Sequence, residues 1–199
     1  MYSEFNRNCT AVILCGGQGR RLGGQDKGLA LLQGRSLVDH VISRIKPQVA
    51  ELVINANRNL HEYSQLGYTV VADQNQNYDG PLSGMLAAMQ HCSTEFLVCV
   101  PCDAPQLPID LVDRFSNLNL GELDIACVHD GERLQPTFSL LRCSIVNRLS
   151  AYLESGERKI DRFYQHCRFA TIDYSDHPSA FINLNRPEDF DRIENSQVD

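Results

Sequence analysis

The chain has 199 residues, enough for one domain with a substantial hydrophobic core. It carries 25 acidic against 18 basic residues, a net charge of −7, which argues against non-specific binding to nucleic acid or to an anionic membrane. The first ten residues lack the apolar core of a signal peptide, and no apolar run approaches the ~20 residues that span a bilayer. We therefore expect a single cytoplasmic domain over residues 1–199.

A glycine-rich loop follows the first predicted strand. Residues 11–15 form a short apolar run, which indicates a buried strand because glycines end it at once. Five glycines follow and let main-chain N–H groups approach an anionic ligand, while Arg20, Arg21 and Lys27 add positive charge. Over residues 16–35, four basic residues accompany a single acidic one, in a chain that is acidic overall. This contrast favours a binding site for a phosphorylated small molecule.

Two common phosphate-binding loops do not account for this pattern. A Walker A loop requires lysine directly after its last glycine, and neither Gly23 nor Gly24 is followed by lysine. The dinucleotide fingerprint would place its third glycine at Leu22, whose bulk opposes close packing of the helix.

Strands and helices alternate through the first 115 residues. This alternation predicts an α/β fold with a Rossmann-like, doubly wound, mixed and mostly parallel sheet and helices on both faces. Ser36 and Asp39 form a capping box for a helix that Pro47 ends. The other elements expected here are strands over residues 51–55, 68–73 and 95–103 and a helix over residues 85–91.

Polar side chains stand where three of these strands end, at Asn55, Asp73 and Asp103. In an open parallel sheet, ligands collect at that edge. A carboxylate at Asp103, across from a glycine loop that carries Lys27, is the arrangement expected for holding Mg²⁺ on the phosphates of a nucleotide. Asp103 could instead cap the next helix, but that helix is expected to begin at Pro108, which leaves Asp103 too far upstream.

The rest of the chain predicts a partly antiparallel continuation of the sheet. The expected elements are helices over residues 109–116, 144–154 and 157–167 and strands over residues 124–129, 135–141, 169–174 and 181–185. An Asp130-Gly131 dipeptide between the first two of these strands is typical of a hairpin. Pro187 should open a last helix, with Asn185 as its cap.

Eight cysteines are scattered along the chain, and we expect them to be reduced and mostly buried. Cys99 and Cys102 have C-x-x-C spacing, but they fall at the end of a strand, where side chains three residues apart face opposite ways. No second pair of cysteines or histidines completes a zinc site.

The loop resembles that of the molybdenum cofactor guanylyltransferases, the MobA family. Leu14-Cys15-Gly16-Gly17, Arg20-Arg21-Leu22-Gly23-Gly24 and Asp26-Lys27-Gly28 are similar to the family pattern L-x-G-G-x-x-x-R-[ML]-G-G-x-D-K. Further segments resemble the family at residues 80–85, 130–133, 156–158 and 181–189. Cys15 replaces the usual alanine and Arg186 the usual threonine. The resemblance runs in order from residue 14 to residue 189.

This resemblance implies transfer of GMP from GTP to molybdopterin carrying molybdenum (Mo-molybdopterin), with Mg²⁺ as cofactor and pyrophosphate as the second product. Residues 10–115 would then form the GTP-binding half, and residues 116–195 the molybdopterin-side half. Transient contacts with molybdopterin-donating proteins and recipient molybdoenzymes are also implied. The implied catalytic residues are Arg21, Lys27 and Asp103, of which Asp103 holds the metal. The implied GTP-binding residues are Leu14, Cys15, Gly16, Gly17, Lys27, Asn55, Asp73, Gly80, Gly84 and Asp103. Those implied for molybdopterin are Arg158, Asn183 and Asn185.

Three other functions remain open from the sequence. A cytidylyltransferase that uses CTP, on molybdopterin or another phosphorylated acceptor, would share the fold and the first loop. A non-catalytic carrier of nucleotide or molybdopterin is a second alternative, although simple carriage requires neither Lys27 nor Asp103. A redox protein built on Cys99 and Cys102 is the third and least supported.

Overall fold

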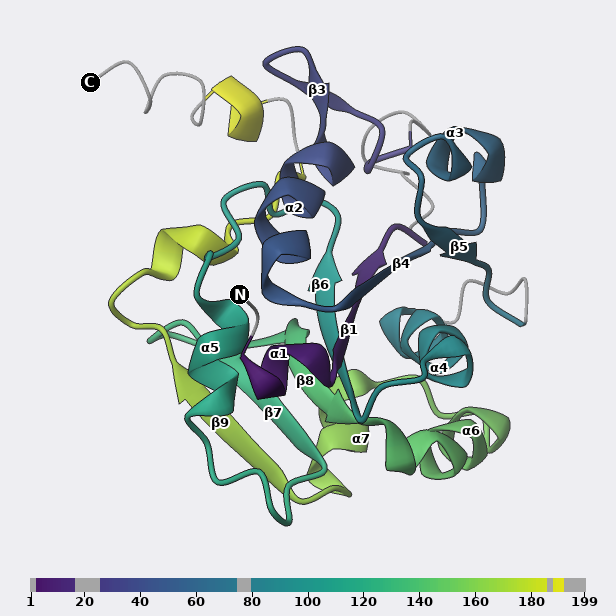
Figure 1. Cartoon of the computed structure of the whole chain (residues 1–199), viewed down its shortest axis with the longest axis vertical. Coiled ribbons are helices and arrows are strands. Elements are labelled where there is room, and N and C mark those ends of the chain that lie inside the picture. The colour runs from purple at the N-terminus through teal and green to yellow at the C-terminus, as the bar shows by residue number, and fades with distance from the viewer. Residues whose placement is uncertain (1–2, 17–25, 75–79, 186–187, 192–199) are drawn as a thin grey trace.

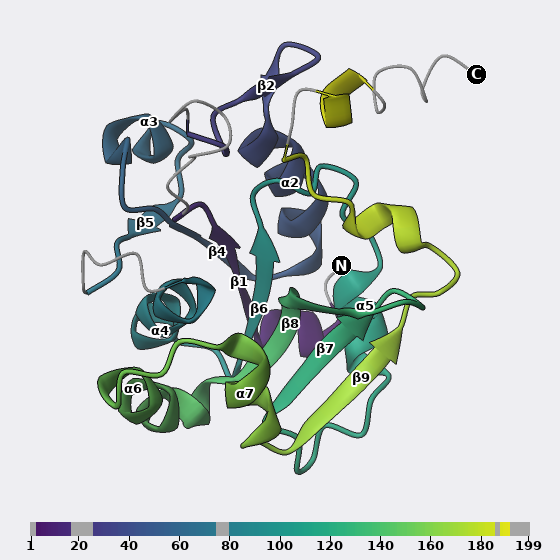
Figure 2. The same cartoon turned by 180° about the vertical axis from the view of Figure 1, so that it is seen from behind.

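A seven-stranded sheet forms the centre of the computed structural model, which describes residues 3–16, 26–74, 80–185 and 188–191. In the order in which they are hydrogen-bonded, the strands are β5 (Thr69–Val71), β4 (Glu51–Asn55), β1 (Cys9–Leu14), β6 (Phe96–Pro101), β8 (Leu134–Arg142), β7 (Ile125–His129) and β9 (Phe169–Asp173). The first four are parallel, β8 runs antiparallel to β6 and β7, and β9 is parallel to β7 (Figures 1 and 2). The predicted Rossmann-like, mostly parallel mixed sheet is therefore confirmed, and strands from both halves of the chain form it.

Helices cover both faces of this sheet. On one face, α2 (Leu37–Ile45) and α5 (Leu111–Ser116) pack through Val41 and Phe115 into the larger core cluster. On the other face, α4 (Pro81–His91), α6 (Val146–Glu154) and α7 (Ile160–Gln165) pack through Met85, Leu149 and Phe163 into a second cluster. Shorter helical segments are α1 (Glu4–Arg7), α3 (Leu60–Ser64) and the 3₁₀ turns η2 (Lys46–Gln48), η3 (Cys143–Ile145) and η4 (Pro178–Phe181). A short ribbon also pairs β2 (Leu31–Leu32) with β3 (Arg35–Ser36).

Because helices cover both faces, the central strands are apolar on both sides. In β1, Ile13 joins the larger cluster and Val12 the second one. The same alternation separates Cys99, in the second cluster, from Cys102, in the larger one. The two thiols therefore lie on opposite sides of the sheet, as predicted, and burial raises the pKa of Cys99 above its ordinary value.

Several helix boundaries follow the predicted signals. The Ser36 hydroxyl accepts the Asp39 N–H at 3.3 Å and donates to Asp39 Oδ2 at 2.5 Å, so the predicted cap of α2 at Ser36 is confirmed. α4 begins at Pro81, earlier than the predicted residue 85, because proline suits the first helical position and Gly80, with φ +84°, turns the chain just before it. This earlier start places Gly84 inside the helix.

One predicted boundary and one predicted element are wrong. The helix predicted over residues 109–116 is present as α5, but it begins at Leu111 and not at Pro108 or residue 109, because residues 109–110 form a turn. The strand expected over residues 181–185 is absent from the sheet, since η4 ends at Phe181 and the chain that follows is irregular. Its main chain bonds to a loop instead, with the Leu184 N–H donating to the Asp103 carbonyl at 2.9 Å.

Pro187, the expected first residue of the last helix, lies outside the described residues. Residues 188–191 are helical. The Asn185 N–H donates to Asp189 Oδ2 at 2.8 Å, so the side chain of Asp189 ties this helix to the chain before it.

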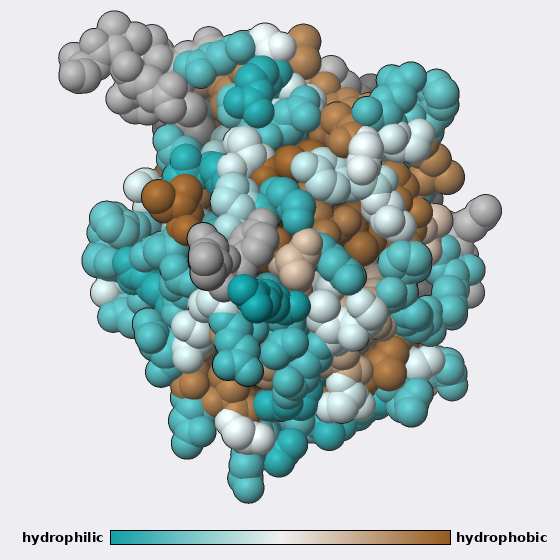
Figure 3. All heavy atoms as spheres, in the orientation of Figure 1, coloured by the Kyte–Doolittle hydropathy of each residue, from teal (hydrophilic) through white to brown (hydrophobic). Residues whose placement is uncertain are grey.

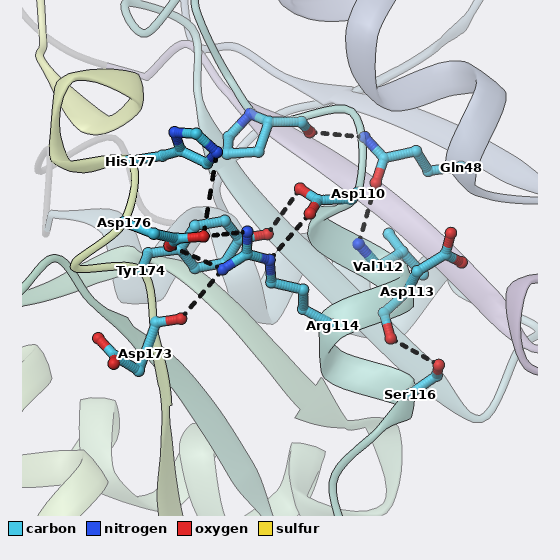
Figure 4. Close-up of polar contacts among 11 residues, drawn as sticks. Gln48, Asp110, Val112, Asp113, Arg114, Ser116, Asp173, Tyr174, Asp176 and His177 are labelled. Atoms are coloured by element: carbon cyan, nitrogen blue, oxygen red, sulfur yellow. Dashed lines mark hydrogen bonds and ion pairs between the residues drawn. The ribbon is translucent and has the colours of Figure 1, made fainter.

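Arg114 of α5 fixes the segment that follows β9 (Figure 4). Its guanidinium donates to Asp110 Oδ2 at 2.8 Å and to both carboxylate oxygens of Asp176, at 2.9 and 2.7 Å. It also stacks on the ring of Tyr174, 4.0 Å from the ring centre. The Tyr174 hydroxyl completes the cluster by donating to Asp110 at 3.1 Å. This cluster directs the chain through η4 toward the carboxyl end of β6.

A buried carboxylate joins the far end of the sheet. Asp124, 3% exposed, accepts hydrogen bonds from Arg148 of α6 at 2.8 Å and from Arg168, beside β9, at 2.9 Å. Against the opposing effect of burial, these hydrogen bonds lower the pKa of Asp124 far below its usual range. The carboxylate is therefore charged whenever the protein is folded near neutral pH.

The surface is mixed in character. In Figure 3, hydrophilic residues cover most of the lower part of the view and hydrophobic ones show mainly above them. Within the described ranges, no helix combines the length and the apolar character needed to cross a membrane.

Candidate active site

Lys27 lies at the centre of the candidate site. Its ammonium group donates to Asp103 Oδ2, just beyond β6, and to Asn185 Oδ1 at 2.6 Å, near the end of the described chain. The side chain of Lys27 is 24% exposed and that of Asp103 is 9% exposed, so the ion pair is largely withdrawn from water but open on the lysine side. The structure thus brings together three predicted site residues that are far apart in the sequence.

A buried network holds the backbone beside Lys27. Asp26 is only 7% exposed. Its carboxylate accepts hydrogen bonds from the Tyr63 hydroxyl at 2.6 Å, the Asn59 amide at 2.9 Å and the Gly28 N–H at 3.1 Å. Burial first of all, and then neighbouring thiols and the bond to Asp26, raise the pKa of Tyr63, so the phenol stays protonated and donates. A side chain at Gly28 would place its Cβ 2.4 Å from the Tyr63 oxygen. Glycine is therefore required at this position.

The sequence did not reveal this network. Asp26 was visible as part of the loop pattern, but Asn59 and Tyr63 come from the neighbourhood of α3, which carries no signal of a site. The adjacency of Asp26 to Lys27 is a signal that could have suggested a role in placing the lysine, but no such role was predicted for Asp26 from the sequence.

The segment over residues 182–185 closes the site on the other side. Leu184 is fully buried against Ala30, Leu32 and Leu37, which anchors the segment beside the Lys27 loop. The Asn185 amide donates to the Asn183 carbonyl at 3.2 Å. Asn183 and Asn185, both predicted for the second substrate, therefore flank the position of Asp103.

Two buried oxygens at this place have no hydrogen-bond partner within the described part of the chain, Asp103 Oδ1 and Asn183 Oδ1. Buried polar atoms are rarely left unpaired, so these two oxygens are candidates for contact with a ligand. A carboxylate oxygen is also the donor that Mg²⁺ and similar hard cations prefer. Among the described residues, no three His, Cys, Asp or Glu side chains are grouped to hold a metal. Asp103 therefore fits a divalent metal that takes its remaining ligands from phosphates and water.

A second polar cluster lies beside the first, at the carboxyl ends of β4 and β5. Asp73 accepts hydrogen bonds from the side-chain amides of Asn55 and Asn57, both at 2.8 Å, and its own N–H donates to Asn57 Oδ1 at 2.8 Å. Asn55 is 2% exposed. An added Cβ at Gly84 would lie 2.2 Å from Asn55 Oδ1, and one at Gly16 would lie 3.2 Å from it. Asn55 and Asp73 were predicted together and do meet, while Asn57 is a member that the sequence did not single out.

The remaining predicted nucleotide contacts lie near these clusters. Leu14 ends β1, and the Cys15 N–H donates to the Asn55 carbonyl at 2.8 Å, which carries β1 directly toward Gly16. Gly80 precedes α4. Gly17 and Arg21 lie outside the described residues.

The other segments predicted for the second substrate have structural contacts of their own. The Arg158 guanidinium donates to the carbonyls of Leu153 at 2.6 Å and Glu157 at 2.7 Å, on the connection between α6 and α7. The Asp130 carboxylate accepts two main-chain N–H groups of the hairpin turn and the Gln135 amide. These contacts do not include Lys27 or Asp103.

Comparison with known proteins agrees with this geometry. A family model described as the MobA-like NTP transferase domain matches residues 11–169. The molybdenum cofactor guanylyltransferase of a Shewanella species (strain MR-4) is 48% identical over 184 residues, and that of Photobacterium profundum is 49% identical over 182 residues. Each alignment covers 92% of this chain and 93% of the relative.

A solved structure shares the fold. The crystal structure of molybdopterin-guanine dinucleotide biosynthesis protein A from Archaeoglobus fulgidus aligns with a TM-score of 0.77 at 21% identity, covering 95% of this chain and 98% of that chain. The match of the family model over most of the chain and the 48–49% identity to these relatives show that this chain belongs to the MobA-like family of nucleotidyltransferases, together with the molybdenum cofactor guanylyltransferases.

Proposed function

We propose that the protein transfers GMP from GTP to Mo-molybdopterin, which yields the guanine dinucleotide form of the cofactor and pyrophosphate. The contact of Lys27 with both Asp103 and Asn185 carries this proposal. It joins the end of the predicted phosphate loop, a strand-end carboxylate and the C-terminal segment, which supports this place as the meeting point of the nucleotide and the second substrate. The names of the similar relatives support guanine nucleotide and molybdenum cofactor as the substrates.

The proposed chemistry is a displacement at the α-phosphorus of GTP. A phosphate oxygen of molybdopterin forms a bond to that phosphorus while the bond to the β-phosphate oxygen breaks, and the electron pair leaves with pyrophosphate. Negative charge therefore grows on the leaving group, where a preorganised cation lowers the barrier. An ammonium group has three N–H donors, and Lys27 directs two of them to Asp103 and Asn185. We assign the third donor, together with Arg21 and the amides of Gly16 and Gly17, to the triphosphate.

The Asp73 cluster is proposed to bind the nucleoside. Asn55 and Asn57 hold the carboxylate in one orientation, and each carboxylate oxygen retains a lone pair for a ligand hydroxyl or N–H. Gly84 allows α4 to lie against Asn55, since an added Cβ would be 2.2 Å from Asn55 Oδ1, and Gly80, with φ +84°, turns the chain into α4.

Asp103 is proposed to hold Mg²⁺ through Oδ1, the oxygen that Lys27 does not occupy. When bound, the metal would neutralise charge on the phosphates of the nucleotide. We assign Asn183, Asn185 and Arg158 to molybdopterin. The unpaired Asn183 Oδ1 supports this assignment most directly, since it can accept a hydrogen bond from the pterin.

Pyrophosphate release tests the proposal. Purified protein is incubated with Mg²⁺, Mo-molybdopterin and either GTP, CTP or ATP, with Mo-molybdopterin omitted as a control. Release that requires both GTP and Mo-molybdopterin would support the proposal. Release with CTP would identify a cytidylyltransferase, whereas GTP binding with no release would identify a carrier.

A further inference from the structure

Two thiols lie in contact at the edge of the sheet opposite the candidate active site. Cys92 ends α4, and Cys143 opens η3 on the way from β8 to α6. The Cys143 thiol donates to the Cys92 sulfur across 3.6 Å. A disulfide bond is about 2.05 Å long, so the sulfurs need to approach by roughly 1.5 Å. Cys92 directly follows α4, and Cys143 directly follows β8 at the start of η3, where its N–H donates to the Glu95 carbonyl at 2.8 Å.

The surroundings of Cys92 favour its charged form. Its sulfur lies 3.0 Å from the Thr94 hydroxyl, which lies 2.8 Å from the hydroxyl of Thr10. The hydrogen bond from Cys143 lowers the pKa of the Cys92 thiol to about 5, against the opposing effect of burial, and Thr10 and Thr94 act in the same direction. A thiolate is the reactive form of cysteine. The other titratable groups around the pair are Cys9, Cys99, Glu51, Glu95 and Arg142.

We propose that Cys92 and Cys143 form an oxidation site at which a hydroperoxide converts the two thiols into a disulfide. The Cys92 thiolate attacks the terminal oxygen of the hydroperoxide, the O–O bond breaks, and the departing alkoxide takes a proton from solvent to leave as an alcohol. Cys92 becomes a sulfenic acid. The Cys143 sulfur then attacks the Cys92 sulfur, an S–S bond forms, the S–O bond breaks, and the hydroxide leaves as water with the Cys143 proton. The two thiols lose two electrons, which the hydroperoxide gains.

The same contact that activates Cys92 prepares Cys143 for the second step. The bond from Cys143 to the Cys92 sulfur is the main reason why the pKa of Cys143 is raised, with burial adding to it. Oxidation of Cys92 to the neutral sulfenic acid removes the charge that this bond stabilises. Cys143 can then release its proton and attack a sulfur that already lies beside it.

Other thiols lack this combination of contact and access. Cys15 and Cys102 are also neighbours, at the ends of β1 and β6, but both are 5% exposed, and the bond from Cys15 together with burial raises the pKa of Cys102 well above its ordinary value. Cys9 is fully buried and donates to a main-chain carbonyl. Cys167 is partly exposed like Cys92, but burial raises its pKa, so it serves as a matched control.

Reactivity at pH 6 gives the size of the expected effect. Relative to a thiol with the ordinary pKa of 9.0, a pKa of about 5 raises the thiolate fraction at pH 6 by roughly 10³. The less basic Cys92 thiolate is also a weaker nucleophile, by roughly 40- to 100-fold, because nucleophilicity falls with pKa along a Brønsted slope of about 0.4–0.5. Because the pKa of Cys167 is raised above 9.0, Cys92 should be modified at least about tenfold faster than Cys167.

The experiment treats the reduced full-length protein with hydrogen peroxide at pH 6, blocks the remaining thiols by alkylation, and maps the peptides by mass spectrometry. We expect one main product, a Cys92–Cys143 linked peptide lighter by two hydrogen atoms. In Cys143→Ser, dimedone should trap a sulfenic acid on Cys92. Cys92→Ser should leave Cys143 unoxidised, and Cys167→Ser should behave as the unaltered protein.

Three results would overturn the proposal. These are a wild-type Cys92 that remains fully available for alkylation after peroxide, linked peptides spread evenly among the cysteines, or a sulfenic acid that forms on Cys143 in place of Cys92. The first two readouts come from the unaltered protein, so they hold even if a serine variant folds poorly.

Discussion

Replacing Gly84 by alanine should destabilise the protein, although alanine is the better helix former. In a helix interior, the change from glycine to alanine alone contributes about 1 kcal/mol of stability. Here the new Cβ would lie 2.2 Å from Asn55 Oδ1 and 2.7 Å from Asn55 Cγ, far inside van der Waals contact. The Asn55 side chain must therefore move, and its amide is held by the Asp73 carboxylate at 2.8 Å and the Val71 carbonyl at 3.3 Å.

The expected cost follows from those two hydrogen bonds. A bond to a charged group contributes about 1.5–3 kcal/mol and a neutral one about 1 kcal/mol, so their loss costs about 2.5–4 kcal/mol. After the gain in helix propensity, Gly84→Ala should lower the free energy of unfolding by about 1.5–3 kcal/mol. Urea unfolding followed by circular dichroism measures this directly.

A double-mutant cycle with Asn55→Ala isolates the cause. Without the Asn55 carboxamide the severe clash disappears, and the close contact that remains is with Leu14 Cδ2 at 3.0 Å, the end of a side chain that can shift slightly. Gly84→Ala in that background should therefore be close to neutral, or stabilise by up to about 1 kcal/mol. An equal loss in both backgrounds, or a Gly84→Ala single variant as stable as the native protein, would refute the reasoning.

Three further predictions concern the ion pair, the buried phenol and the acid limb of stability. Lys27→Ala should lower the rate of pyrophosphate release by at least ~10²-fold, the scale for one lost charge-stabilising donor. As a control, Lys46→Ala removes an ammonium that is bound to a main-chain carbonyl near the amino end of β4, and it should retain the rate. Equal rates in the two variants would show that Lys27 is not catalytic. Tyr63→Phe removes the buried hydroxyl that donates to the Asp26 carboxylate, and it should lower the free energy of unfolding, measured in urea, by about 1.5–3 kcal/mol. An unchanged urea midpoint would contradict a stabilising role for the Asp26 network. Asp124 has a pKa lowered by two arginines against burial, so its stabilising contribution is present above the unfolded pKa of about 3.9 and is lost as pH falls. Asp124→Asn should therefore be less stable than the native protein at pH 7, with a gap that narrows below about pH 4; a gap independent of pH would exclude this linkage.

Local signals predicted the first half of the fold well. β4 was predicted with its observed bounds, and the Ser36 cap formed as expected, because apolar runs, glycines and capping residues act over a few neighbours. The Asp130-Gly131 turn likewise predicted the antiparallel pair of β7 and β8. The start of α5 was predicted too early because proline is favourable in a turn as well as at the first residue of a helix, and the neighbouring residues do not distinguish the two.

Long-range contacts limited the rest. Residues 181–185 alternate apolar and polar side chains, as a strand does, but such alternation suits any extended chain that lies on a core. Leu184 is buried against residues from β2 and α2, and its N–H bonds to Asp103. The partners of Asp26 were equally invisible, since Tyr63 is 37 positions away and nothing near it in the sequence points to the loop.

The contact between Lys27 and Asn185 spans 158 positions of the sequence. A chain is synthesised at about 5–20 residues per second, so roughly 8–30 s separate the addition of these two residues. During that interval the sheet order of β4, β1 and β6 can already form, while the ammonium lacks one of its two anchors. A nascent chain can therefore hold Lys27 beside Asp103 well before the segment that closes the candidate site exists.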